Sequence, residues 1–258
     1  MPMERREILS LELTAELATV WQHLRDPALA RRWFGTGGPG SDEEIRRDLI
    51  EGADEGRLIE HDSTTHTLTW PNHDVLAVSA AAHEPRHTRL VVTRPSHDAY
   101  GHGYDGVLDD RDERWIANAH QLQFALRVHP GQERRTLAAK DLDAGPRPAR
   151  LLDQAGLHGI RGVPVGGHVQ ARRPDGTLLG GTLLYKTEHQ LGLQLHGTTE
   201  SLLIVRETPA GTRPPNGTVS PVLSVYGLDD ETFAQVERRW ESWWQGAGAK
   251  PAGTQVGA

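Results

Sequence analysis

Residues 14–35 read TAELATVWQHLRDPALARRWFG and carry the strongest structural signal in the chain. Four apolar side chains in this stretch recur at intervals of three and four residues, which makes one face of a helix: Leu17, Val20, Trp21 and Leu24. Thr14 precedes this helix as a candidate cap. Asp26 and Pro27 end it and begin a second helix, because proline suits the first helical turn. We therefore expect two short helices in succession, the second ending at Gly35.

Strand-like segments surround these helices. Alternating apolar and polar residues at 7–13 predict a strand before them. A charged segment at 41–55, which we expect to be helical, follows the glycine-rich loop at 35–40. Four further strands are then expected at 57–61, 66–70, 75–80 and 88–93. A long helix at 109–128, whose acidic start suits the helix dipole, closes this half of the chain.

The second half repeats the later part of this plan. A short helix at 149–156 and a final helix at 228–246 enclose five expected strands at 166–172, 178–186, 189–196, 200–206 and 218–226. Two pairs of stretches are alike: 56–70 with 181–193, and 88–95 with 201–209. We therefore expect two copies of one fold, a first domain over residues 1–140 and a second, abbreviated one over residues 141–258.

Composition excludes several classes of protein. The 258 residues carry a net charge of −7 and no cysteine, which argues against nucleic-acid binding, disulfides and thiolate metal sites. No apolar run is long enough to cross a membrane, and the N-terminus lacks a signal-peptide pattern, so we expect a cytoplasmic protein. The 14 histidines lack the spacing of a zinc site. We therefore expect neither metal nor cofactor.

The 14–35 segment resembles the opening helices of the SRPBCC (START/Bet v 1-like) superfamily, in particular its branch similar to the Hsp90 ATPase activator. The residues in register with that pattern are Val20, Trp21, Leu24, Asp26, Pro27, Trp33, Phe34 and Gly35. A second family-like stretch, 56–70, follows at the expected distance. The resemblance implies an α+β fold of two tandem helix-grip domains, each a curved antiparallel sheet around a long C-terminal helix, with a cavity between sheet and helix. The second half lacks the opening helices, so its assignment depends on the internal repeat.

The same resemblance frames the functional hypothesis. The two-domain form is similar to helix-grip proteins of actinomycete natural-product pathways, including enediyne (dynemicin-type) biosynthesis. The favoured function is binding of an apolar small molecule, polyketide- or polyene-derived, in biosynthesis or self-protection. One alternative is a polyketide cyclase or aromatase, so whether the protein is an enzyme is left open. Another is an activator of a chaperone ATPase, and a protein partner is likewise left open.

The candidate ligand-binding residues are mostly aromatic side chains on expected helix faces, where core packing and a cavity wall are both reasonable roles. They are Trp21, Trp33, Phe34, Trp70, Trp115, Ala119, His120, Leu122, Leu126, Tyr185, Tyr226, Trp240 and Trp243. Arg94 and Arg206 recur on strands of the repeat and could anchor a ligand oxygen or form surface salt bridges. No arrangement typical of a catalytic nucleophile is recognisable, so no catalytic residue is assigned.

Overall fold

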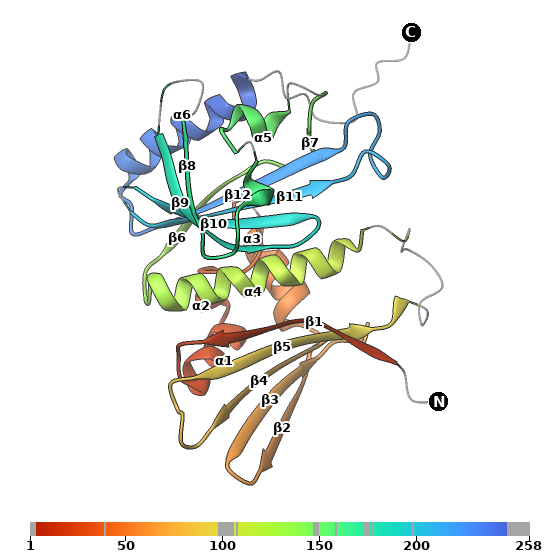
Figure 1. Ribbon diagram of the computed structural model, residues 1–258. Coiled ribbons are helices and arrows are strands. Elements are labelled where there is room, and N and C mark those ends of the chain that lie inside the picture. The colour runs from red at the N-terminus through yellow and green to blue at the C-terminus, as the bar shows by residue number, and fades with distance from the viewer. Residues whose placement is uncertain are drawn as a thin grey trace. The chain divides into compact units, whose positions relative to one another are not determined.

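The computed structural model describes residues 4–38, 40–97, 106, 108–146, 150–157, 159–172, 176, 178–197 and 199–246. The chain divides into two compact units, residues 1–134 and 135–258. Each unit is α+β and contains one antiparallel sheet (Figure 1). Within the described ranges, no helix is both long enough and apolar enough to cross a membrane.

The first unit begins with a strand, continues through short helices and ends in a long helix. Its elements are β1 (Arg5–Leu13), α1 (Leu17–Arg25), α2 (Pro27–Ala30), α3 (Ser41–Ile45), a π-helical turn η1 (Arg46–Ile50), β2 (Asp54–Glu60), β3 (Ser63–Thr69), β4 (Val75–Ala81), β5 (Thr88–Pro95) and α4 (Asp110–Val128). The strand order is β1-β5-β4-β3-β2, so β1 reaches across to pair with the last strand, as Figure 1 shows.

The two opening helices are confirmed as α1 and α2. The Asp26 carboxylate accepts a hydrogen bond from the Ala28 backbone N–H at 2.8 Å, and Pro27 occupies the first turn of α2. Glu16, rather than Thr14, occupies the N-cap of α1, and it makes no side-chain capping bond. The expected helix over 41–55 is too long: η1 ends at Ile50, and β2 begins at Asp54 after a turn at Gly52, whose φ is 74°.

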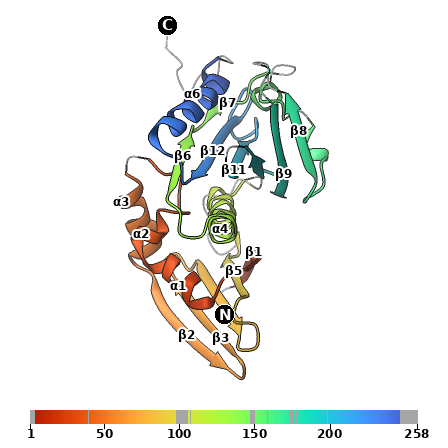
Figure 2. The same ribbon diagram turned by 90° about the vertical axis from the view of Figure 1, so that its left-hand side faces the viewer.

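Alternation along the central strands builds the core of the first unit. The register sets Leu68 beside Leu76, and Leu76 beside Val92, so that one face of the sheet is apolar and buried. α1 lies along the sheet (Figure 2), and its Trp21 ring stacks on His66 with centroids 4.7 Å apart. α4 contacts β1 and contributes three buried side chains that the sequence placed on one stripe, namely Ala119, Leu122 and Leu126.

The second unit consists of a larger sheet with one long helix. Its elements are β6 (Arg134–Ala138), β7 (Leu142–Asp143), α5 (Leu151–Gln154), a 3₁₀ turn η3 (Ile160–Gly162), β8 (His168–Arg172), β9 (Leu178–Lys186), β10 (Gln190–His196), β11 (Ser201–Thr208), β12 (Thr218–Tyr226) and α6 (Asp230–Gly246). The strand order is β6-β12-β11-β10-β9-β8, with β7 pairing with β12. β6 and β7 were not expected from the sequence.

α6 packs on one face of this sheet, as both views show (Figures 1 and 2). A row of leucines crosses four strands on that face: Leu183, Leu193, Leu203 and Leu223. Trp240 and Trp243 of α6 belong to the same core cluster, together with Leu151 of α5. The Trp243 indole N–H also donates to the Leu151 carbonyl at 2.9 Å, which fastens α5 to α6.

The two sheets share a topology, and this tests the internal repeat. Reading from β1 and from β6, the orders β1-β5-β4-β3-β2 and β6-β12-β11-β10-β9 correspond strand by strand. The similar stretches 56–70 and 181–193 therefore lie on equivalent hairpins, β2–β3 and β9–β10. The second pair of stretches does not match in this way, because 88–95 forms β5 whereas 201–209 covers β11, and the equivalent of β5 is β12. Arg94 and Arg206 are consequently not equivalent positions.

Candidate functional site

A cavity in the second unit opens between α6 and the ends of its sheet strands. We call it the α6 pocket. Its apolar lining comes from β9, β10, β12, the residue Leu228 and α6 itself: Leu178, Leu179, Leu195, Leu223, Val225, Leu228, Val236 and Trp240. The polar lining residues are His196, Thr199, Ser201, Thr232 and Arg239. The pocket thus combines an apolar interior with hydrogen-bonding groups, the arrangement typical of small-molecule sites.

The volume of the α6 pocket is about 140 Å³. Apolar cavities of about 150 Å³ admit a molecule such as benzene. Sites for whole drug-sized ligands are larger, about 300–1,000 Å³. The pocket therefore has room for one ring or the end of a chain. Leu178, which is 59% exposed, extends this apolar surface outside the pocket and could contact the rest of a longer molecule.

The thirteen candidate residues are distributed over both units. In the first unit, six are buried in the structure: Trp33, Phe34, Trp70, Ala119, Leu122 and Leu126. Trp21, Trp115 and His120 are partly exposed there. In the second unit Tyr185, Tyr226, Trp240 and Trp243 are buried, and Trp240 lines the α6 pocket. A binding role for the other twelve stays a prediction.

Tyr185 and Trp243 have well-defined packing partners. The Tyr185 ring lies against Gly192, where a Cβ atom would come within 2.1 Å of the ring, and its hydroxyl donates to Gln190 Oε1 at 2.8 Å. Tyr185 and Tyr226 both lie outside the core cluster beneath α6. Trp243 stacks edge-on against Trp240, with centroids 5.8 Å apart. Trp243 thereby holds Trp240 in place at the wall of the pocket.

A buried ion-pair network lies in the first unit, where β5 meets the start of α4. Arg94 is 7% exposed; its Nε lies 2.9 Å from Asp74 Oδ1, and its Nη1 lies 2.8 Å from Asp109 Oδ2 and also pairs with Asp112. Arg6 adds ion pairs to Asp109, at 3.1 Å, and to Asp112. Arg94 thus makes salt bridges, one of the two roles considered for it, but buried rather than on the surface.

The network holds its groups in their charged states. Burial by itself would raise the pKa of the Asp109 carboxyl, but the hydrogen bond and charge of Arg94 outweigh it and lower that pKa below its usual range. Burial likewise opposes ionisation of Arg94, yet its hydrogen bonds with Asp112 and Asp74 raise the pKa of the guanidinium above its ordinary value. The charges are therefore kept by mutual pairing.

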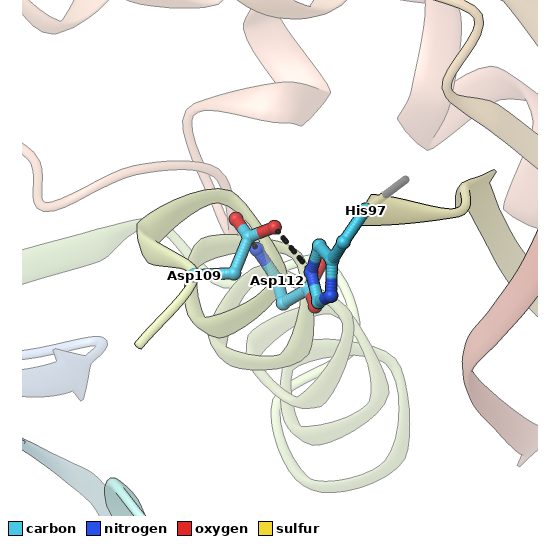
Figure 3. Close-up of side chains that lie close together, drawn as sticks. All are labelled: His97, Asp109 and Asp112. Carbon is cyan, nitrogen blue, oxygen red and sulfur yellow. Dashed lines mark hydrogen bonds and ion pairs between the residues drawn. The ribbon is translucent and has the colours of Figure 1, made fainter. Parts of the chain in front are cut away.

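His97, Asp109 and Asp112 form a group whose ligand atoms lie within 4.8 Å of one another, the spacing of a metal site (Figure 3). His97 Nε2 is 3.1 Å from Asp109 Oδ2. The same carboxylates are already bonded to the guanidinium groups of Arg6 and Arg94. A divalent cation would have to displace these fixed positive charges. We therefore interpret the cluster as an ion-pair network.

Two tryptophans extend this network toward the core. The Trp115 indole N–H donates to Asp74 Oδ2 at 3.1 Å, and the rings of Trp70 and Trp115 lie 5.1 Å apart. Periodicity placed Trp115 on the helix face, but it gave no indication of Asp74, which lies in the turn between β3 and β4. An aspartate beside such a turn carries no sequence signal of burial, so the network could not be assembled from the sequence.

His120 of α4 gives a pH-dependent prediction. Burial lowers the pKa of its imidazole to about 4, against a smaller opposing effect of a hydrogen bond with Gln123. Because the unfolded chain binds the proton more readily, the free energy of unfolding should fall as pH drops from about 6.5 toward 4. We expect His120→Gln to remove about 1–2 kcal/mol of the loss between pH 7 and pH 5.

The measurement is urea unfolding of both proteins at pH 7 and pH 5. His23 and His66 also have lowered pKa values caused by burial, so the difference between wild type and variant is the informative quantity. His83→Gln, at an exposed histidine, provides the control and should leave the pH dependence unchanged. Equal losses in wild type and His120→Gln would contradict the prediction.

Comparison with known proteins yields two structural likenesses. No protein-family model matches the chain, and no curated protein matches it. The di-domain ARO/CYC BexL from the BE-7585A biosynthetic pathway is 13% identical, with a TM-score of 0.31, over 98% of this chain and 100% of its own. The di-domain ARO/CYC StfQ from the steffimycin biosynthetic pathway is 10% identical, with a TM-score of 0.27, over 99% of this chain and 100% of its own. At such scores no residue role is transferred from either protein.

Proposed function

We propose that the second unit binds a small apolar molecule in the α6 pocket. The observation that supports this is the pocket itself, whose interior is lined by leucine, valine and tryptophan side chains. Burial of apolar ligand surface there would stabilise the complex, and Ser201 and Thr199 could hydrogen-bond to a polar substituent. Because the volume is about 140 Å³, the pocket would take one ring or one chain end.

In this proposal both units are helix-grip domains. The shared strand order and the packing of α6 on its sheet support this assignment. The ligand would be a polyketide- or polyene-derived molecule of natural-product biosynthesis or self-protection, as the family-like segment at 14–35 implies. A conjugated ring or polyene end would pack against the face of Trp240, which favours flat unsaturated groups.

Thermal unfolding with small probes tests this function. Toluene, naphthalene and sorbic acid represent single rings, fused rings and a short polyene. At ten times its dissociation constant, a bound probe should raise the free energy of unfolding by about 1.4 kcal/mol. The melting temperature of the second unit should then rise by about 4–8 °C.

A matched pair of variants locates the site. Val236→Phe adds a ring inside the α6 pocket and should abolish the shift. Val165→Phe makes the same change at a valine that is 59% exposed and outside the pocket lining, and it should keep the shift. An unmoved melting curve for wild type, or a shift retained by Val236→Phe, would rule out this site.

The enzyme alternative predicts a different result. A cyclase or aromatase would convert a linear poly-β-ketone into a cyclic product, whereas a binding protein would only protect it from spontaneous cyclisation. Product analysis by mass spectrometry and absorbance, with Val236→Phe as a blocked control, separates the two. The chaperone-activator alternative predicts stimulation of ATP hydrolysis by an Hsp90-type ATPase.

A further inference from the structure

A second cavity in the second unit shares no lining residue with the α6 pocket. We call it the loop pocket. It lies between α5, the η3 turn, the residues preceding β10 and the connection from β11 to β12. Its volume is about 440 Å³, within the range of about 300–1,000 Å³ that ligand sites occupy.

Charges of both signs line the loop pocket and nearly cancel. Two arginines, Arg150 and Arg161, face three carboxylates, Asp153, Glu188 and Glu207. Arg161 is committed to structure, since its Nη2 pairs with Glu207 at 2.6 Å and its Nη1 donates to the Thr187 carbonyl at 2.6 Å. A strongly charged ligand would therefore meet both attraction and repulsion, whereas an uncharged one would meet neither.

One hydroxyl in the lining has no hydrogen bond. Thr218 is 1% exposed, and its Oγ1 is without a partner in the described part of the chain. Buried hydroxyls are almost always paired, because leaving one unpaired costs stability. Thr88, buried to the same degree in the first unit, shows the usual arrangement: its Oγ1 donates to the Ala15 carbonyl at 2.8 Å. The Thr218 hydroxyl is thus an exception that destabilises the free protein.

We propose that the loop pocket binds an uncharged, polyhydroxylated molecule of about hexose size. Each hydroxyl of such a molecule both donates and accepts, so neighbouring hydroxyls can match the mixture of donors and acceptors around the pocket. Arg150 and Glu188, which are exposed and have no ion pair in the described ranges, supply a donor and an acceptor. Rotation about its Cα–Cβ bond would turn the Thr218 hydroxyl from its shielded position toward the ligand.

The first part of the test compares two identical substitutions. Thr218→Val removes the unpaired hydroxyl and keeps the shape, so the melting temperature should stay the same or rise. Thr88→Val removes a paired hydroxyl and should lower the melting temperature. If Thr218→Val destabilises the protein as Thr88→Val does, the hydroxyl has a structural partner and the proposal fails.

The second part measures binding by ligand-observed NMR and calorimetry on the full chain. Glucose, galactose, mannose and myo-inositol are the neutral probes, while glucosamine and glucose 6-phosphate are the charged ones. At least one neutral probe should bind saturably, and Thr218→Val should weaken it about tenfold while Thr88→Val does not. Val236→Phe should leave this binding unchanged, which separates the loop pocket from the α6 pocket. Absence of binding by all four neutral probes, or a preference for the phosphate, would overturn the proposal.

Discussion

Arg94→Ala should lower the free energy of unfolding of the first unit by about 3–5 kcal/mol. The guanidinium is buried and pairs with Asp74, Asp109 and Asp112, so its loss leaves three carboxylates crowded together with less compensation. Asp74 is 3% exposed and would suffer most, because water cannot replace the missing partner. Urea unfolding at pH 7, followed by tryptophan fluorescence, would show the loss as a lower midpoint.

Arg31→Ala is the matched control for this variant. Arg31 also bonds an aspartate through two nitrogens, with its Nε 2.5 Å and its Nη2 2.8 Å from the Asp42 carboxylate oxygens. Both side chains are more than half exposed, however, so the pair should contribute about 1 kcal/mol or less. Equal effects of the two substitutions would mean that burial does not set the strength of the Arg94 network.

Trp243→Ala should destabilise the second unit by about 3–5 kcal/mol. Its side chain is 4% exposed, packs in the core cluster and against Trp240, and bonds the Leu151 carbonyl. The substitution would open a large cavity and release α5 from α6. Differential scanning calorimetry would record the loss as a lower transition temperature for the second unit.

Trp243→Phe separates packing from hydrogen bonding. It retains an aromatic ring but loses the indole N–H, so it should cost much less than the alanine variant. If Trp243 were a ligand contact rather than a core residue, both substitutions would leave stability nearly unchanged and would alter only probe binding. That result would contradict the packing role.

The sequence predicted the elements whose signal is local. Leu17, Val20 and Leu24 define the buried face of α1, and proline at 27 marks the start of α2. β6 and β7 lacked such a signal. β6 contains two arginines and lies at a sheet edge, and β7 has two residues that are strand only because they pair with β12. Long-range pairing, rather than intrinsic preference, forms both.

The candidate site was less predictable because distant segments build it. Trp240 could be identified from the helical period of α6, but Leu179, Leu195 and Leu223 reach the α6 pocket from three different strands. On each strand they look like ordinary core residues. Arg94 posed the same difficulty, since its partners come from the turn before β4 and from the start of α4. A single sequence gives no register between such segments.

The pairing of β1 with β5 has a consequence during synthesis of the protein. Arg5 pairs with Pro95, and Leu13 with Thr88, so β1 leaves the ribosome about 80 residues before its partner. At about 5–20 residues per second, that delay is on the order of 4–16 s. Throughout it, β1 exposes unpaired backbone groups and apolar side chains, among them Leu13, which is buried in the finished unit. The nascent chain therefore presents a ready binding segment to ribosome-associated chaperones, which β5 later displaces.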